Sequence, residues 1–385
     1  MQASKILNLL LNVSSKASKI ASIIRSEKPL VELLVEEKQG IEKNDRFVQD
    51  FKTLADVLIQ ETVRHYVSVE IPDIGASIYG EESNKFTNVQ GETITVKICS
   101  SCDETEKLLV TVLNGNAEAA ALLATAVHSE ATSLTVQTED VPVIIPIEDC
   151  GIWIDPIDST GQYIKGKLGE ENEYGMFEDG LQCVAILIGL FEKSTGKPIL
   201  GVVVQPFAKF ISETESWTSR TIWGVSFNGL NKTSFEPTSE ASNTEARIVL
   251  SKSESEQVQK ALSTKYKLDF ASGAGYKLLA TVLGLSRAYV LSHRSIYRWD
   301  CCAIHPILRA VGGGIVSYKH TLQAARYPEG ELTEEDLHAL QVSYTKASGA
   351  IRNRRNSFSD KTESLPGIIA YRSAADVLDI LNLLK

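Results

Sequence analysis

Long apolar runs are absent from this 385-residue chain. No stretch approaches the roughly 18 to 20 apolar residues that a membrane-spanning helix needs, so insertion into a membrane is not expected. The N-terminal run, ILNLLLNV, is short, and apolar residues at helical spacing continue past Lys16 and Lys19. Because nothing after them is typical of a signal-peptidase site, we expect an amphipathic first helix and a cytoplasmic protein.

An excess of basic residues is also absent. The 39 lysines and arginines are outnumbered by 49 aspartates and glutamates, which gives a formal net charge of −10. A chain of this charge repels nucleic-acid backbones and anionic lipid, so neither is expected as the principal partner. A small phosphorylated substrate is compatible with it only where bound cations or a local group of basic side chains reverse the sign of the field.

Cysteine and histidine are scarce, with six of each. A chain of this length does not need disulfides to fold, and a reducing compartment is the plain interpretation. Cys99 and Cys102 have CxxC spacing, but no second pair and no histidine pair at metal-ligand spacing accompanies them. This pattern argues against a redox site and against a zinc or iron centre held by histidine.

The first part of the chain combines helices with short strands. At roughly 150 residues per domain, the length predicts two domains or one large body in two parts. Helical periodicity over 51–67 is followed by breaking residues and a short strand over 77–79, which runs into Gly80. Residues 92–148 are polar and alanine-rich, with one helix signal over 108–127. We interpret this stretch as an inserted subdomain or lid.

Apolar strand patterns dominate the middle of the chain. They cover 151–154, 181–190, 198–204 and 221–227. Runs this apolar predict strands that are buried on both faces. The segment 228–246 is rich in Ser, Thr, Asn, Glu and Pro and predicts a linker.

Alternating strand and helix patterns beyond this segment predict a second α/β unit. Pro306 cannot donate a backbone hydrogen bond, so we expect a kink or a 3-10 start in the helix over 301–311. The predicted organisation is therefore an N-terminal α+β metal-binding domain over 1–240 and a C-terminal α/β substrate-binding domain over 241–385.

Acidic residues stand where strands end or helices begin, positions from which side chains project into clefts. They are Asp56, Glu81 and Glu82 after Gly80, Asp155 and Asp158 in WIDPIDST, and Asp300 in RWDCCAIHPILR. Carboxylates gathered in this way are the ligands that Mg²⁺ prefers.

The run WIDPIDST contains both halves of a phosphate-hydrolysing site. Pro156 forces the chain to turn after Asp155, so that Asp155 and Asp158 can face one point, and the turn exposes the Ile157 carbonyl as a further oxygen ligand. The Ser-Thr pair that follows can open a short helix, whose free amides accept a phosphate. Carboxylates beside an anion site predict Mg²⁺ and a phosphoryl group.

A structural interpretation of the same run is that Asp155 or Asp158 only caps a helix. The combination with Glu81 and Glu82 after a strand, and with Asp300 at a helix start, makes that interpretation insufficient. Like charges that converge in a partly dry cleft without a cation would repel one another by several kcal/mol. The sequence therefore favours a metal site.

The motifs as a set resemble the lithium-sensitive, magnesium-dependent inositol monophosphatase and fructose-1,6-bisphosphatase superfamily. The strings that carry the resemblance are FKTLADVLIQ, GEESNKFTN, GIWIDPIDSTGQYIKG, GLQCVAILIG, GAGYK and RWDCCAIHPILRAVGGG. They are most similar to the branch that removes the 1-phosphate of inositol polyphosphates. The likeness spans most of the chain and is weakest over 92–148 and after Val316. It implies an α+β or α/β fold, a layered αβαβα sandwich.

Carried over position by position, the resemblance implies a role for each acidic residue. The implied metal ligands are Glu81, Glu82, Asp155, the Ile157 carbonyl, Asp158 and Asp300. The implied catalytic residues are Asp56, Thr160 and Glu81. Two or three Mg²⁺ ions would bind at such a site, and Asp56 with Thr160 would orient the attacking water. Displacement of one magnesium by Li⁺ would cause inhibition.

The resemblance also implies a substrate site. Its residues are Asp158, Ser159, Thr160, Ser253, Gly273, Ala274, Lys277 and Ser295. The ammonium of Lys277 is the natural partner of a second phosphate on a chain of net charge −10. One position departs from the family pattern, because Ser255 stands where the family has a lysine. That replacement puts the affinity for the distal phosphate in question.

The implied activity is hydrolysis of the 1-phosphate of inositol 1,4-bisphosphate and inositol 1,3,4-trisphosphate by a monomer or weak dimer. An alternative is a 3′-phosphoadenosine 5′-phosphate phosphatase of the same superfamily, against which Ser159 counts because the nucleotide phosphatases usually carry glycine there. A second alternative is a metal-binding scaffold without turnover. It would predict the loss of a ligand or of Thr160, and all are present.

Overall fold

The computed structural model describes residues 1–26, 35–37, 51–88, 90–130, 135–236, 246–326, 332–346 and 363–385. The expected domain boundary at 240/241 lies outside these residues, so it stays untested. Among the described residues, no helix combines the length and the apolar character needed to cross a bilayer.

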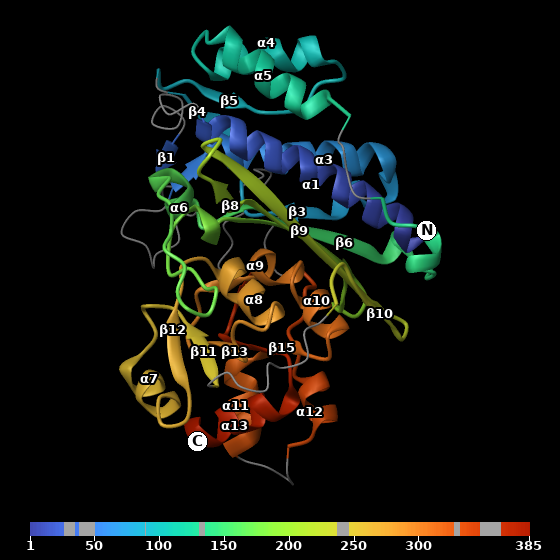
Figure 1. The fold of residues 1–385 in the computed structure, drawn as a ribbon. Coiled ribbons are helices and arrows are strands. Elements are labelled where there is room, and N and C mark those ends of the chain that lie inside the picture. The colour runs from blue at the N-terminus through green and yellow to red at the C-terminus, as the bar shows by residue number, and fades with distance from the viewer. Residues whose placement is uncertain are drawn as a thin grey trace.

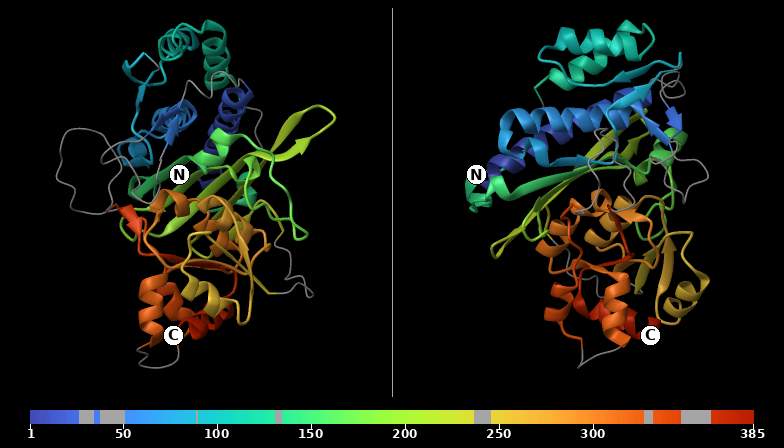
Figure 2. Two further views of the ribbon diagram at one scale, coloured as in Figure 1. Left: turned by 90° about the vertical axis from the view of Figure 1, so that its left-hand side faces the viewer. Right: turned by 180° about the vertical axis from the view of Figure 1, so that it is seen from behind.

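Helices and sheets alternate in layers along the long axis of the molecule (Figure 1). A pair of long helices covers one face of a six-stranded sheet, shorter helices fill the space between this sheet and a five-stranded sheet, and a last helical layer covers the far face. The predicted αβαβα sandwich is confirmed. Figure 2 shows from two further sides that the insertion lies on the outer face of the long helices, away from the sheet.

The two long helices are amphipathic, as their spacing predicted. They are α1 (Ala3–Ser26) and α3 (Leu54–Glu70). The apolar face of each is buried in one core with the first sheet. The short strand β2 (Phe51–Thr53) pairs with β1 (Val35–Glu37) immediately before α3. Thr53 and Asp56 then form a reciprocal capping box that fixes where α3 begins.

The insertion contains two helices where the sequence indicated one. They are α4 (Cys102–Val112) and α5 (Ala117–His128), and a short hairpin of β4 (Lys85–Thr87) and β5 (Thr93–Thr95) precedes them. The expectation of one helix over 108–127 was wrong because Asn114 and Gly115 both adopt positive φ, which ends α4 and reverses the chain. α5 packs on α1.

The first sheet has the order β10-β9-β8-β7-β6-β3. Its strands are β3 (Ile78–Gly80), β6 (Cys150–Asp158), β7 (Ala185–Glu192), β8 (Pro198–Ile211), β9 (Ser216–Phe227) and β10 (Leu230–Thr233). Only the β3–β6 pair is parallel. The predicted linker over 228–246 was wrong at its start: Asn228 and Gly229 take positive φ, form a tight hairpin turn and lead into β10.

The second sheet has the order β12-β11-β13-β17-β15. Its strands are β11 (Arg247–Leu250), β12 (Lys267–Phe270), β13 (Ala288–Leu291), β15 (Gly314–Ser317) and β17 (Ile368–Tyr371). The strands β12, β11 and β13 run parallel, whereas β17 runs antiparallel to both its neighbours. β14 (Ile296–Tyr297) and β16 (Ser364–Leu365) form a separate two-stranded antiparallel sheet.

Helices cover both faces of the second sheet (Figure 1). The inner helices are α8 (Ala274–Val282), α9 (Arg298–Cys302) and α10 (His305–Ala310). The outer ones are α7 (Glu256–Leu262), α11 (Tyr318–Arg326), α12 (Glu334–Ala339) and α13 (Ala374–Leu384). The break expected at Pro306 is confirmed, because α9 ends before it and Pro306 occupies the first turn of α10.

A row of three glycines lets the inner helices approach the first sheet. Gly189, Gly201 and Gly224 lie opposite one another on β7, β8 and β9. A Cβ on any of them would overlap the α9–α10 backbone between Cys302 and Ile307. The absence of side chains along this row brings α9, and Asp300 within it, close to the first sheet.

His305 is fully buried between the two sheets. Its Nε2 accepts a hydrogen bond from the Ile315 amide at 3.2 Å, so Nδ1 carries the proton and donates to the Tyr344 hydroxyl at 2.9 Å. Trp153 of the first sheet donates to the Tyr344 carbonyl. Desolvation by burial, with a smaller contribution from Arg309, lowers the pKa of His305 to about 3.

This burial makes the protein sensitive to acid. The unfolded chain binds a proton at this histidine below pH 6.5, whereas the folded chain does not until about pH 3, so its contribution to stability is present above pH 6.5 and lost as the pH falls. At pH 4 the loss is about 3 kcal/mol. In denaturant unfolding at a series of pH values, His305→Gln should show a correspondingly flatter decline than the wild type. Parallel declines would contradict the prediction.

Candidate active site

Two aspartates at the end of β6 point to the same side of the sheet. Side chains three apart on a regular strand face opposite ways. Here the pairing of β6 with β7 shifts between Asp155, which lies opposite Leu187, and Asp158, which lies opposite Ala185. The bulge at Pro156 adds one residue to β6, which puts Asp155 and Asp158 on the same face of the sheet. Both carboxylates therefore face the inner helices. The turn that the proline predicted therefore takes the form of a bulge.

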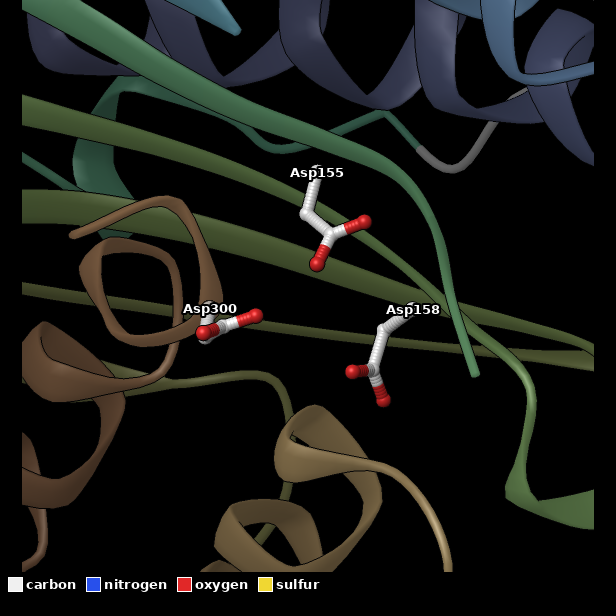
Figure 3. Close-up of side chains that lie close together, drawn as sticks. All are labelled: Asp155, Asp158 and Asp300. Carbon is white, nitrogen blue, oxygen red and sulfur yellow. The ribbon is translucent and has the colours of Figure 1, made fainter. Parts of the chain in front are cut away.

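Asp300 completes a cluster of three carboxylates. It is the third residue of α9, and one of its oxygens accepts a hydrogen bond from the Tyr297 amide at 2.6 Å. Each of the three aspartates offers an oxygen within 4.8 Å of the other two, and their carboxylates point toward one another (Figure 3). Asp155, Asp158 and Asp300 are only 1%, 6% and 8% exposed. The sequence prediction that these three converge is confirmed.

The cluster carries more negative charge than its surroundings stabilise. Burial raises the pKa of Asp155, and Glu81 and the other two aspartates raise it further. Burial also raises the pKa of Asp300 and brings that of Asp158 to about 6. Asp155 Oδ1 is buried and has no hydrogen-bond donor among the described residues. Buried hard oxygens short of donors fit a divalent cation such as Mg²⁺.

Glu81 and Glu82 follow β3, the parallel neighbour of β6. The Glu81 amide donates to the Ile154 carbonyl, which keeps this turn beside the aspartates. Gln60 of α3 holds the turn at two points: its side-chain oxygen accepts from the Glu82 amide at 2.9 Å, and its nitrogen donates to the Glu82 carbonyl at 2.6 Å. A Cβ at Gly80 would overlap the Gln60 side chain, which explains the glycine of this motif.

Asp158 also touches the start of α8. Its two oxygens accept from the Ala274 and Gly275 amides at 3.1 and 3.0 Å. Gly273 adopts a φ of +78°, and a Cβ there would lie 2.7 Å from Asp158 Oδ2. Asp158 thus binds the first amides of α8, in the second half, in addition to its place in the acidic cluster. The same contact brings Gly273 and Ala274 to the acidic cluster.

Lys277 lies one turn further along α8 and is 3% exposed. Its ammonium donates to the Ala271 and Gly273 carbonyls and lies 5.2 Å from the centre of the Tyr289 ring. Its charge lowers the pKa of Asp158. Lys277 therefore supports the turn before α8, and its predicted contact with a second phosphate stays a prediction.

The turn after the bulge opens a short helix, as the motif predicted. Ser159 takes a left-handed φ of +74° and α6 (Thr160–Lys165) follows it. The Thr160 hydroxyl donates to the Ile157 carbonyl at 3.0 Å. In α3, one oxygen of Asp56 accepts from both the amide and the hydroxyl of Thr53. A joint role of Asp56 and Thr160 at one water stays a prediction.

The remaining substrate residues lie in loops of the second half. Ser253 is exposed in the turn after β11, and Ser295 is half-buried between β13 and β14. Ser255, at the position of the family lysine, is the N-cap of α7, and its hydroxyl accepts from the Val258 amide.

Two polar residues that support the site were missed in the sequence. Gln60 lies one helical turn after Asp56, on the same buried face of α3, and a polar residue in that spacing was a usable signal. Glu254 is buried among serines in the loop between β11 and α7, and the only signal was a glutamate in the serine-rich run that follows an apolar strand.

The sequence model of the "Inositol monophosphatase family" matches residues 8–355. The mouse protein "Inositol polyphosphate 1-phosphatase" is 42% identical over 96% of this chain and 94% of its own length. The human protein of the same description is 41% identical over 99% and 97%. "3'(2'),5'-bisphosphate nucleotidase 1" of Dictyostelium discoideum is 33% identical but covers 44% of this chain and 52% of its own.

A solved structure supports the fold. The "extragenic suppressor protein suhB" from Bartonella henselae superposes with a TM-score of 0.51 over 99% of this chain and 98% of that one, at 11% identity. The family model and the near full-length relatives confirm the predicted family and its enzyme class, a phosphatase. The chain belongs to the inositol monophosphatase family.

Proposed function

We propose that this chain is a cytoplasmic, Mg²⁺-dependent and Li⁺-inhibited phosphatase that removes the 1-phosphate of inositol 1,4-bisphosphate and inositol 1,3,4-trisphosphate. The observation that carries the proposal is the buried cluster of Asp155, Asp158 and Asp300, one oxygen of which has no donor within the described residues. Support for the substrate comes from the mouse and human relatives, which match this chain over nearly their whole length. We propose that the enzyme acts as a monomer or weak dimer.

The ligand set we propose follows the carboxylates. Glu81, Glu82, Asp155, the Ile157 carbonyl, Asp158 and Asp300 hold two or three Mg²⁺ ions. Bound Mg²⁺ supplies an acidified water and neutralises charge on the phosphate. Li⁺ competes for one of these positions.

The other residues orient the reactants. Asp56, Thr160 and Glu81 hold the water, and the Asp56 carboxylate accepts its proton, while the amides of Ser159 and Thr160 donate to the scissile phosphate. The inositol ring and its distal phosphate contact a further set of residues. That set is Asp158, Ser253, Gly273, Ala274, Lys277 and Ser295.

Phosphate release from both inositol substrates tests the proposal, with Mg²⁺ present and with Li⁺ added. We expect hydrolysis of both in Mg²⁺, none after chelation, and strong inhibition by Li⁺. Because a bisphosphate nucleotidase matches part of this chain, 3′-phosphoadenosine 5′-phosphate must be assayed as a third substrate for comparison.

Two results would contradict the proposal. Much faster hydrolysis of the adenosine compound would make this chain a nucleotide phosphatase. Cation binding without turnover of any of the three substrates would favour a scaffold.

A further inference from the structure

Glu254 is a buried carboxylate outside the metal cluster, and its side chain has no exposed surface. It lies in the loop between β11 and α7. One of its oxygens accepts from the Ser255 amide at 2.8 Å and from the Ser292 hydroxyl at 2.5 Å. The other accepts from the Ser292 amide at 2.8 Å and lies 3.8 Å from Nδ1 of His293. Three of these four contacts are therefore hydrogen bonds from neutral donors.

The contacts of Glu254 join two loops and a helix. The Ser255 amide belongs to the loop after β11, and Ser292 belongs to the loop after β13. The Glu254 carbonyl also accepts from the Gln259 side chain in the first turn of α7 at 2.8 Å. Removing the carboxylate would leave the two loops without this cross-link.

Both loops lie at the edge of the second sheet that faces the acidic cluster. The strands β12, β11 and β13 are parallel, so the segments that follow them emerge at the same edge. The segment after β12 leads into α8, whose first amides bind Asp158. The loops that carry Ser253 and Ser295 therefore emerge on the side of the metal cluster.

We propose that Glu254 is a positioning residue for substrate recognition, which fixes the loop over 251–255 against the loop over 292–295. This inference rests on the proposed function, because Ser253 and Ser295 are its proposed substrate contacts. The carboxylate accepts hydrogen bonds from both loops. It can do so because both of its oxygens are acceptors and neither carries a proton. Glutamine would present an NH₂ group to donors that now face oxygen, leaving at least one buried donor unpaired.

The test is steady-state kinetics of Glu254→Gln on inositol 1,4-bisphosphate. We expect KM to rise about tenfold, which corresponds to one lost buried hydrogen bond, with kcat within about twofold of the wild type. Mn²⁺ binding measured by calorimetry should be unchanged, because no proposed metal ligand is touched. Ser292→Ala removes only the hydroxyl donor, and we expect a smaller rise in KM.

Asp376→Asn is the matched control. Asp376 is also a buried carboxylate next to the second sheet, 4% exposed, but it pairs with Arg287 at the opposite ends of these strands. This variant should lose stability and keep the wild-type KM. If Glu254→Gln does not fold, Ser292→Ala decides in its place.

If the wild type is active on inositol phosphates and Glu254→Gln keeps the wild-type KM, the positioning role is overturned. The same result in Ser292→Ala has the same meaning where Glu254→Gln does not fold. A wild type inactive on both inositol substrates would instead overturn the proposed function and this inference together.

Discussion

Asp155→Asn is expected to abolish cation binding and to cut phosphate release by about a thousandfold or more, while it stabilises the metal-free protein. Asp155 is one of the three carboxylates of the cluster, and the loss of a ligand removes several kcal/mol of transition-state stabilisation. Without a cation, the ionised carboxylate is destabilising, since burial and Glu81 raise its pKa. The neutral amide relieves that penalty, so the melting temperature should rise by about 2 °C or more at pH 7.5.

The stability difference between Asp155→Asn and the wild type should depend on pH in one direction. A raised folded pKa means that the wild-type penalty is greatest at high pH and disappears as Asp155 is protonated. The stability difference between Asp155→Asn and the wild type should therefore shrink as the pH falls. Calorimetry with Mn²⁺ and thermal unfolding without metal measure both parts.

Asp269→Asn is the control, because this aspartate is also largely buried, at 9% exposed, but forms an ion pair with Arg247 at 2.6 Å. It should lower the melting temperature and leave Mn²⁺ binding intact. Wild-type Mn²⁺ affinity in Asp155→Asn would contradict the metal site.

The acidic cluster could be predicted from the sequence because each aspartate lies at a position where the backbone must change direction. Pro156 lies in the bulge near the end of β6, and the Trp-Asp pair marks the start of α9. Such local signals identify which side chains leave the core. How these side chains meet depends on contacts between distant segments of the chain. One example is the row of Gly189, Gly201 and Gly224, which lets α9 pack close to the first sheet and has no periodic pattern in the sequence.

Other parts of the fold had no local signal. The strand β17 comes from the last residues of the chain and inserts between β13 and β15, so its pairing is a matter of topology. The glycine before α8 was visible in GAGYK, but its reason, the close approach of Asp158, involves a residue more than a hundred positions earlier. Lys277 was expected to face a ligand, and its carbonyl contacts depend on the turn at Gly273.

Asp56→Asn is expected to lower kcat by about a hundredfold to ten-thousandfold, the usual contribution of a positioned proton acceptor, and to leave Mn²⁺ binding largely intact. Asparagine keeps the shape of the side chain and one oxygen that can accept from Thr53, so α3 should still begin at the same residue. What is lost is the negative charge that we propose holds the water. Single-turnover phosphate release and calorimetry separate the two effects.

The chain contains its own control for the capping part of this role. Thr333 and Asp336 form the same box at the start of α12 as Thr53 and Asp56 form at α3, with the Thr333 amide and hydroxyl both donating to one oxygen of Asp336. Asp336→Asn should lower the stability only slightly and leave kcat unchanged. If Asp56→Asn behaves like Asp336→Asn, with a small loss of stability and wild-type turnover, Asp56 has no part in catalysis and serves only to begin a helix.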